Sequence, residues 1–137
     1  MDGIKIEGTK TRTSSFDEST GNGSSTTSVS NGKITLTDGT VATWTSERSR
    51  VSDLDAGTVT TDVNASVVAN GTTIYSHNTT TPLVEKLNCG KPGPVSGVVA
   101  SVYRTNNITI DFGNGSCNNR SVTITVNGVT TTRTIGE

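Results

Sequence analysis

Four turn dipeptides set the organisation of this chain, because each stands between runs in which threonine or serine alternates with valine, isoleucine or leucine. Two-residue hairpin loops require positive φ angles, which Asn-Gly and Asp-Gly adopt at little cost. Alternation with a period of two buries one face of a sheet and wets the other. The pattern predicts an all-β fold, an antiparallel meander of hairpins forming a thin sandwich or a strongly twisted sheet. The dipeptides are Asn31-Gly32, Asp38-Gly39, Asn70-Gly71 and Asn127-Gly128.

The composition indicates one domain with a thin core. A chain of 137 residues fits a single β domain spanning residues 1–137. Valine, isoleucine, leucine and phenylalanine supply about a fifth of it, close to the composition at which disorder is expected. A net charge of −1 and the regular alternation argue against an unfolded chain. No segment has apolar residues at helical spacing, so helix should be scarce.

The charge balance argues against nucleic acid as a partner, and the lack of a long apolar stretch argues against a membrane span. Eleven basic and twelve acidic residues create no field that would attract nucleic acid. No stretch approaches the roughly 18 apolar residues of a membrane-spanning helix. The first residues also lack an apolar signal region, and we interpret Met1 as the start of an expressed or trimmed segment. We therefore expect no nucleic acid and no membrane span.

The two cysteines, Cys89 and Cys117, are an even count in a chain of extracellular character. This predicts a structural disulfide, which would stabilise the fold by about 3–4 kcal/mol by restricting the unfolded chain. Two buried free thiols are the alternative. A metal site is disfavoured, because two cysteines and the distant His77 fall short of the four ligands that zinc takes.

No residue pattern indicates catalysis or a cofactor. His77 is the only histidine, and no nucleophile stands near it in a recognisable motif, so we interpret it as a solvated strand residue. The carboxylate pairs Asp17/Glu18 and Asp53/Asp55 lie in polar segments without the aromatic residues of a glycosidase cleft. We expect a protein that is not an enzyme and needs neither a metal nor a cofactor.

Trp44 is a candidate glycan platform. Hairpins at Asn31-Gly32 and Asp38-Gly39 would join strands over residues 26–30, 33–37 and 40–51. In that register Trp44 lies beside Lys33, on the wetter face, where an indole either binds a ligand or covers a second small core. The buried face would hold Val29, Ile34, Leu36 and Val41.

Both end segments are expected to be paired strands, because chain ends fray unless a sheet holds them. The first of them is also the candidate assembly strand, with Ile4, Ile6, Thr9, Thr11 and Thr13 as its alternating residues. Pro82 predicts an edge or a bulge, since proline cannot donate to a ladder. The remaining strands are expected at residues 3–14, 58–69, 72–76, 79–87, 95–103, 107–112, 120–126 and 129–135.

Threonine recurs at every second position in several strands. Such columns of threonine along one face of a strand, which we call threonine files, are typical of ice-binding surfaces. Any threonine-rich strand with one wet face gives the same pattern, and we favour that interpretation. Across the last hairpin the register should pair Thr125 with Thr130 and Thr123 with Thr132. The files are Thr9/Thr11/Thr13, Thr35/Thr37, Thr43/Thr45, Thr58/Thr60, Thr123/Thr125 and Thr130/Thr132/Thr134.

Five stretches combine turn and strand residues in a familiar order. They are residues 3–10 (GIKIEGTK), 31–35 (NGKIT), 38–44 (DGTVATW), 111–119 (DFGNGSCNN) and 122–128 (VTITVNG). Together they resemble secreted or lipid-anchored β-rich surface proteins of Bacteroidota that have no assigned activity. Because those proteins carry further strands upstream, the resemblance implies that this chain is the C-terminal part of a longer protein. It also implies an extracellular or outer cell-surface location.

These observations predict an extracellular structural or adhesive module. If upstream strands are missing, an edge of the sheet is left open and can pair with another copy, so we expect self-association through edge strands and a subunit of a surface filament. A glycan-binding surface module that uses Trp44 is the second hypothesis. An ice-binding threonine face is the third.

Overall fold

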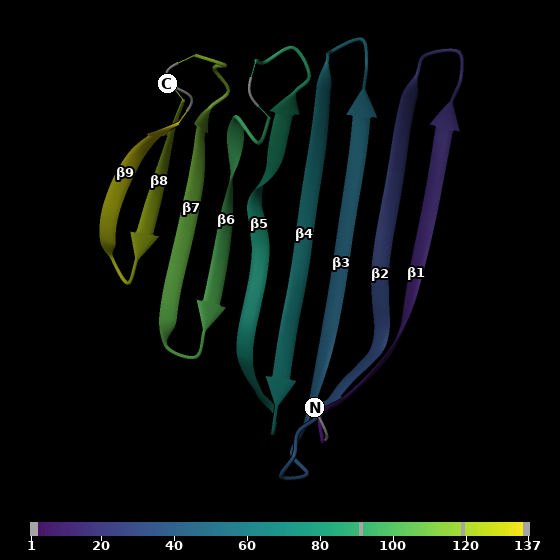
Figure 1. Ribbon diagram of the computed structural model, residues 1–137, viewed down its shortest axis with the longest axis vertical. Coiled ribbons are helices and arrows are strands. Elements are labelled where there is room, and N and C mark those ends of the chain that lie inside the picture. Colours follow the sequence, from purple (N-terminus) through teal and green to yellow (C-terminus); the bar gives the residue numbers. More distant parts are fainter. Residues whose placement is uncertain (1–2, 91, 119, 136–137) are drawn as a thin grey trace.

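The computed structural model describes residues 3–90, 92–118 and 120–135, and it confirms the antiparallel all-β meander. Each strand pairs with the next along the chain, in one nine-stranded sheet that does not close (Figure 1). β1 and β9 are therefore its two edges. The described residues contain no helix that is long and apolar enough to cross a membrane. The strands are β1 (Lys5–Asp17), β2 (Asn22–Thr35), β3 (Val41–Asp53), β4 (Thr58–Ala69), β5 (Thr72–Lys86), β6 (Ser96–Tyr103), β7 (Asn106–Asn114), β8 (Arg120–Val126) and β9 (Val129–Ile135).

Of the two predicted forms, a thin sandwich or a strongly twisted sheet, the structure has the single sheet. All nine strands belong to one sheet, and in the described part of the chain no second sheet packs on either face (Figure 1). Alternation made one face more apolar than the other, but it supplied no second layer to cover that face. Large apolar side chains consequently stay in water: Ile6 is 68% exposed, Phe16 69% and Val129 71%.

Two of the predicted turns form as expected. Asn70-Gly71 joins β4 to β5 with φ angles of 53° and 74°, and Asn127-Gly128 joins β8 to β9 with 49° and 85°. Positive φ at both central residues defines the type I′ turn, whose twist matches that of the flanking strands. The strands that these turns connect have the predicted bounds at β4, β8 and β9.

The hairpin predicted at Asn31-Gly32 is wrong. Asn31 does have a positive φ of 56°, but the dipeptide is a bulge inside β2, where the pairing with β3 shifts between Val29 and Gly32. An asparagine in the left-handed region followed by glycine fits a bulge as well as a tight turn. The continuous strand pairs through twelve residues with β1 and through eleven with β3, and two short strands would lose part of this pairing.

The hairpin at Asp38-Gly39 forms, but its loop is longer than two residues. The Leu36 N–H donates to the Thr40 carbonyl at 2.8 Å, and Asp38 Oδ1 accepts from the Thr40 N–H at 2.8 Å. Thr35 consequently pairs with Val41, one place away from the predicted register.

The buried face predicted for Val29, Ile34, Leu36 and Val41 is therefore wrong. Ile34 pairs with Ala42 and lies on the face of Trp44, whereas Val41 points to the opposite face. Trp44 pairs with Gly32 instead of lying beside Lys33.

β5 joins two segments that the sequence predicted as separate strands. It runs without a break, but its pairing with β6 shifts on both sides of Thr81, next to Pro82. The bulge predicted from Pro82 is thus confirmed.

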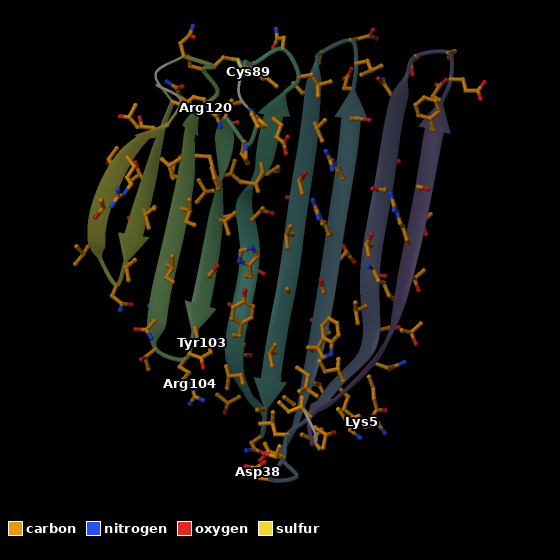
Figure 2. The ribbon with its side chains drawn as sticks, viewed as in Figure 1. Lys5, Asp38, Cys89, Tyr103, Arg104 and Arg120 are labelled. Carbon is orange, nitrogen blue, oxygen red and sulfur yellow. A yellow bond between two sulfur atoms is a disulfide. The ribbon has the colours of Figure 1, made fainter. Side chains whose placement is uncertain are left out.

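The predicted disulfide between Cys89 and Cys117 is confirmed, and it lies beside the best-buried part of the molecule. It ties the β5–β6 connection to the β7–β8 connection, with 5.3 Å between the two Cα atoms. At the same end of the sheet, Arg120 is only 6% exposed and donates to the Pro94 carbonyl at 2.7 Å (Figure 2). Val95, at 1% exposure, lies in this end cluster. A small core needs such a cross-link, because burial alone adds little stability.

Candidate binding surfaces on the two faces and at the edges

The register gives the sheet two chemically different faces, because paired residues of antiparallel strands point to the same side. We call the face that carries Trp44, Tyr75 and Tyr103 the aromatic face; these three residues lie in one row that also includes Val67. The next row of this face crosses all nine strands. It consists of Lys10, Val29, Ser46, Ala65, His77, Ser101, Ile108, Val126 and Val129.

We call the opposite side the threonine face. Hydroxyl and amide side chains dominate it, and its carboxylates include Glu47 and Asp62. One of its rows also crosses the whole sheet. It consists of Thr11, Ser28, Glu47, Asn64, Asn78, Ala100, Thr109, Thr125 and Thr130.

A basic hollow of about 520 Å³ lies on the aromatic face over β1, β2 and β3. Lys10 and Arg12 line it from β1, Arg48 and Arg50 line it from β3, and Trp44 stands at one end of the β3 file. Arg12 and Arg48 are in the same row, two strands apart, which separates their backbones by about 10 Å. Neighbours two residues apart within a strand are about 7 Å apart. No acidic side chain is among the described residues that line the hollow.

These four cations are exposed, and none of them has a carboxylate partner among the described residues. The one ion pair among the described residues is Lys5–Glu7, at 3.3 Å, near the start of β1. Threonine, serine and valine side chains of β2 form the floor between the two basic files. The hollow is therefore a surface of concentrated positive charge in a chain of nearly neutral net charge.

Trp44 is half-buried because it lies over the bulge in β2. A Cβ at Gly32 would come within 2.8 Å of both Cδ1 and Nε1 of the indole, so only glycine leaves room for the ring. An aromatic ring over a glycine in the neighbouring strand shields the exposed backbone there. The indole Nε1 is buried and has no hydrogen-bond acceptor among the described residues.

A second polar group on the aromatic face centres on β5 and β6. The rings of Tyr75 and His77 are stacked with their centroids 6.5 Å apart, and His77 Nδ1 lies 2.6 Å from Ser101 Oγ. His77 is thus half-buried and hydrogen-bonded rather than fully solvated. Toward the other end of β6, Arg104 lies 5.6 Å above the Tyr103 ring, and its hydrogen bond to that residue raises the pKa of Arg104 (Figure 2).

The threonine face has a smaller hollow, of about 330 Å³, lined by Glu47, Asp62, Asn64 and Asn78. Thr79 Oγ1 donates to Asp62 Oδ1 at 2.8 Å, so this carboxylate already has a partner. Within the described ranges no three histidine, cysteine or acidic side chains gather as metal ligands would.

The predicted threonine pairs of the last hairpin are confirmed. The hydroxyls of Thr125 and Thr130 lie 3.0 Å apart, and those of Thr123 and Thr132 lie 3.4 Å apart. In the central strands the threonine rows are interrupted by Glu47. An ice-binding face therefore stays a prediction, and a charged group within the array is unfavourable to it.

The predicted assembly strand lies at the edge of the sheet. Thr9, Thr11 and Thr13 belong to β1 and project from the threonine face, whereas Ile6 projects from the aromatic face. Ile4 immediately precedes the strand and is 47% exposed. Along β1 each of these strand residues has its partner in β2, and no strand of the described ranges lies on the other side of β1.

Sequence reasoning missed the basic hollow. The spacing of Lys10-x-Arg12 and Arg48-x-Arg50 was the available signal, since residues two apart on a strand share a face. Bringing the two pairs together also required β2 to be one continuous strand between them, and the dipeptide at its bulge was interpreted as a turn.

Comparison with known proteins returned no matching family model, no matching curated protein and no matching solved structure.

Proposed function

We propose that this protein is a non-enzymatic, extracellular structural or adhesive module whose copies join edge to edge by strand addition. The main support for this joining is the exposure of β1, a thirteen-residue strand at the edge of the sheet whose residues are all exposed. A long, uncovered edge presents a row of backbone donors and acceptors to another strand. Proline, a common means of blocking such an edge, is absent from β1. The disulfide is compatible with an extracellular protein.

The strand number supports an open chain of copies. Consecutive strands are antiparallel and there are nine of them, so β1 and β9 run in the same direction. A copy related by simple translation would bring its β9 beside β1 in parallel, with both faces continuous across the joint. Such a head-to-tail contact does not close on itself and generates a filament. A two-fold axis would instead pair β1 with β1.

Side chains favour the head-to-tail joint. Pairing β1 with β1 would set Lys10 and Arg12 of two copies on adjacent strands of one face, where like charges destabilise a sheet. The only charged side chain that β9 brings to that face is that of Arg133. On the other face, the β1 file Thr9/Thr11/Thr13 would meet the β9 file Thr130/Thr132/Thr134, so that threonine would lie beside threonine, as it also does in the antiparallel pair of β8 and β9.

The seven residues of β9 limit the strength of the joint. Each backbone hydrogen bond adds about 0.5–1.5 kcal/mol, whereas association costs at least about 4 kcal/mol in lost freedom of motion. We therefore expect assembly at high local concentration, such as that of a protein anchored on a surface.

Two adjacent proline variants test the role of β1. N–H groups of neighbouring strand residues point to opposite sides, so of Thr13→Pro and Ser14→Pro one removes a donor to β2 and the other removes a donor at the free edge. We expect wild-type protein at millimolar concentration to form polymers in sedimentation velocity and electron microscopy. The free-edge variant should keep its thermal stability and stay monomeric. Wild-type protein that stays monomeric, or a free-edge variant that polymerises equally well, would contradict the proposal.

A further inference from the structure

We infer that the basic hollow formed by Lys10, Arg12, Arg48 and Arg50 binds an anionic polysaccharide, with Trp44 packing against a sugar ring. This inference goes beyond edge-to-edge assembly, because the hollow lies on a face of the sheet and not at its edge. It also does not depend on that assembly.

The charge of the hollow favours a polyanionic ligand. Four exposed cations surround one hollow, and the described part of the chain places no acidic residue in its lining and no ion-pair partner beside any of them. Because neighbouring cations lie about 7–10 Å apart, which is within a Debye length at low salt, they repel one another. A ligand with several negative groups relieves that repulsion, and a single small anion cannot reach all four.

The side chains that line the hollow fit an acidic sugar chain. Arginine offers a planar fork of donors that fits carboxylate and sulfate groups in two-point contacts. The floor of Ser25 and Thr27 adds hydroxyls at the level of the sheet, and both residues are half-buried. Trp44 contributes an apolar wall at one end, a combination typical of sites that bind amphipathic rings such as sugars.

Two other occupants fit less well. The threonine face of a second copy presents separated carboxylates, and one of them, Asp62, already accepts a hydrogen bond from Thr79. Duplex DNA carries one charge per about 3.4 Å of helix axis on each strand, which is denser than the cation spacing here.

The single tryptophan makes the site directly observable. Trp44 is the only tryptophan, so its fluorescence reports this hollow and no other part of the chain. We would titrate the folded protein at low salt with polygalacturonate, which carries carboxylates, and with dextran sulfate, which carries sulfates. Neutral dextran and single-stranded DNA would be the comparison polymers.

We expect at least one acidic polysaccharide to shift the Trp44 emission, with an affinity that falls as salt is added, while neutral dextran has no effect. The polymer that binds tells whether carboxylate or sulfate is preferred. Arg48→Ser should weaken binding about tenfold, the loss of one charge-assisted contact. Arg50→Ser provides a second, independent variant on the same strand.

Lys33→Ser is the matched control. It removes one positive charge from the neighbouring strand on the threonine face, and it should change the affinity by less than about twofold, since exposed charges away from the ligand contribute little. Four outcomes would overturn the inference: no emission change with either acidic polysaccharide, equal losses in Arg48→Ser and Lys33→Ser, tighter binding of DNA than of any polysaccharide, or a salt-sensitive dimer that Arg48→Ser abolishes.

Discussion

Trp44 combines a well-packed ring with a buried N–H group that has no acceptor among the described residues. Its ring covers Gly32 and lines the basic hollow, but its Nε1 is buried without an acceptor in the described structure. An unsatisfied buried donor costs about 1–3 kcal/mol. Stability alone would favour a ring without that N–H group, so the indole gives this position a polar atom that packing over a glycine does not require.

Replacing Trp44 separates its packing from its N–H group. Trp44→Phe keeps an aromatic cover over Gly32 and removes the unpaired donor, so we expect the free energy of unfolding to change by less than about 1 kcal/mol. Trp44→Ala loses the cover and should cost about 2–3 kcal/mol, less than a fully buried tryptophan would. Urea unfolding followed by circular dichroism measures both. Equal losses in the two variants would show that the N–H group has a stabilising partner.

The turn dipeptides predicted the bounds of several strands correctly, but they also predicted a hairpin that does not form. The bounds of β4, β8 and β9 follow from alternation that ends at Asn-Gly dipeptides. The same signal at Asn31-Gly32 marks a bulge, because the local backbone conformation is nearly the same in both cases. Which of them forms depends on the pairing of β2 with both neighbours, and a local motif does not contain that information.

The β2–β3 hairpin should lose stability in acid through Asp38. Hydrogen bonds from the Thr40 hydroxyl and from its backbone N–H lower the pKa of Asp38 below its ordinary value of 3.8. A carboxylate whose pKa is lowered by folding stabilises the protein above its unfolded pKa, and that contribution disappears as the pH falls through the folded pKa.

We therefore expect Asp38→Asn to reduce the difference in melting temperature between about pH 6 and about pH 2. Asp55→Asn, in the β3–β4 turn, is the control and should leave that difference unchanged. A wild-type difference that persists fully in Asp38→Asn would exclude this residue as a source of the acid sensitivity.

At the scale of the whole molecule, the chain builds one open sheet with two unlike faces and two free edges (Figure 1). Alternation predicted that the faces would differ, but it contains nothing about how many layers form, so the sandwich and the single sheet could not be separated from sequence. The basic hollow was equally out of reach, because its cations come from strands that β2 separates. The disulfide was predictable, since the chain has just two cysteines.

Cysteine cross-linking can detect the proposed head-to-tail joint between β1 of one copy and β9 of the next. Strands that pair lie about 4.8 Å apart, within the range that a disulfide bridges. One sample of the protein carries Thr11→Cys, at the centre of the β1 threonine file, and a second carries Thr132→Cys, at the centre of the β9 file. Thr45→Cys, on the same face but in the interior strand β3, is the control.

The two samples are mixed, oxidised mildly and analysed by mass spectrometry of their cross-linked peptides. We expect Thr11→Cys to join to Thr132→Cys between copies, neither of them to join efficiently to itself, and Thr45→Cys to form no cross-link. Cross-links exclusively between two Thr11→Cys copies would show a two-fold β1–β1 contact and contradict the head-to-tail filament. The absence of any cross-link above the Thr45→Cys level at millimolar protein would contradict edge-to-edge assembly itself.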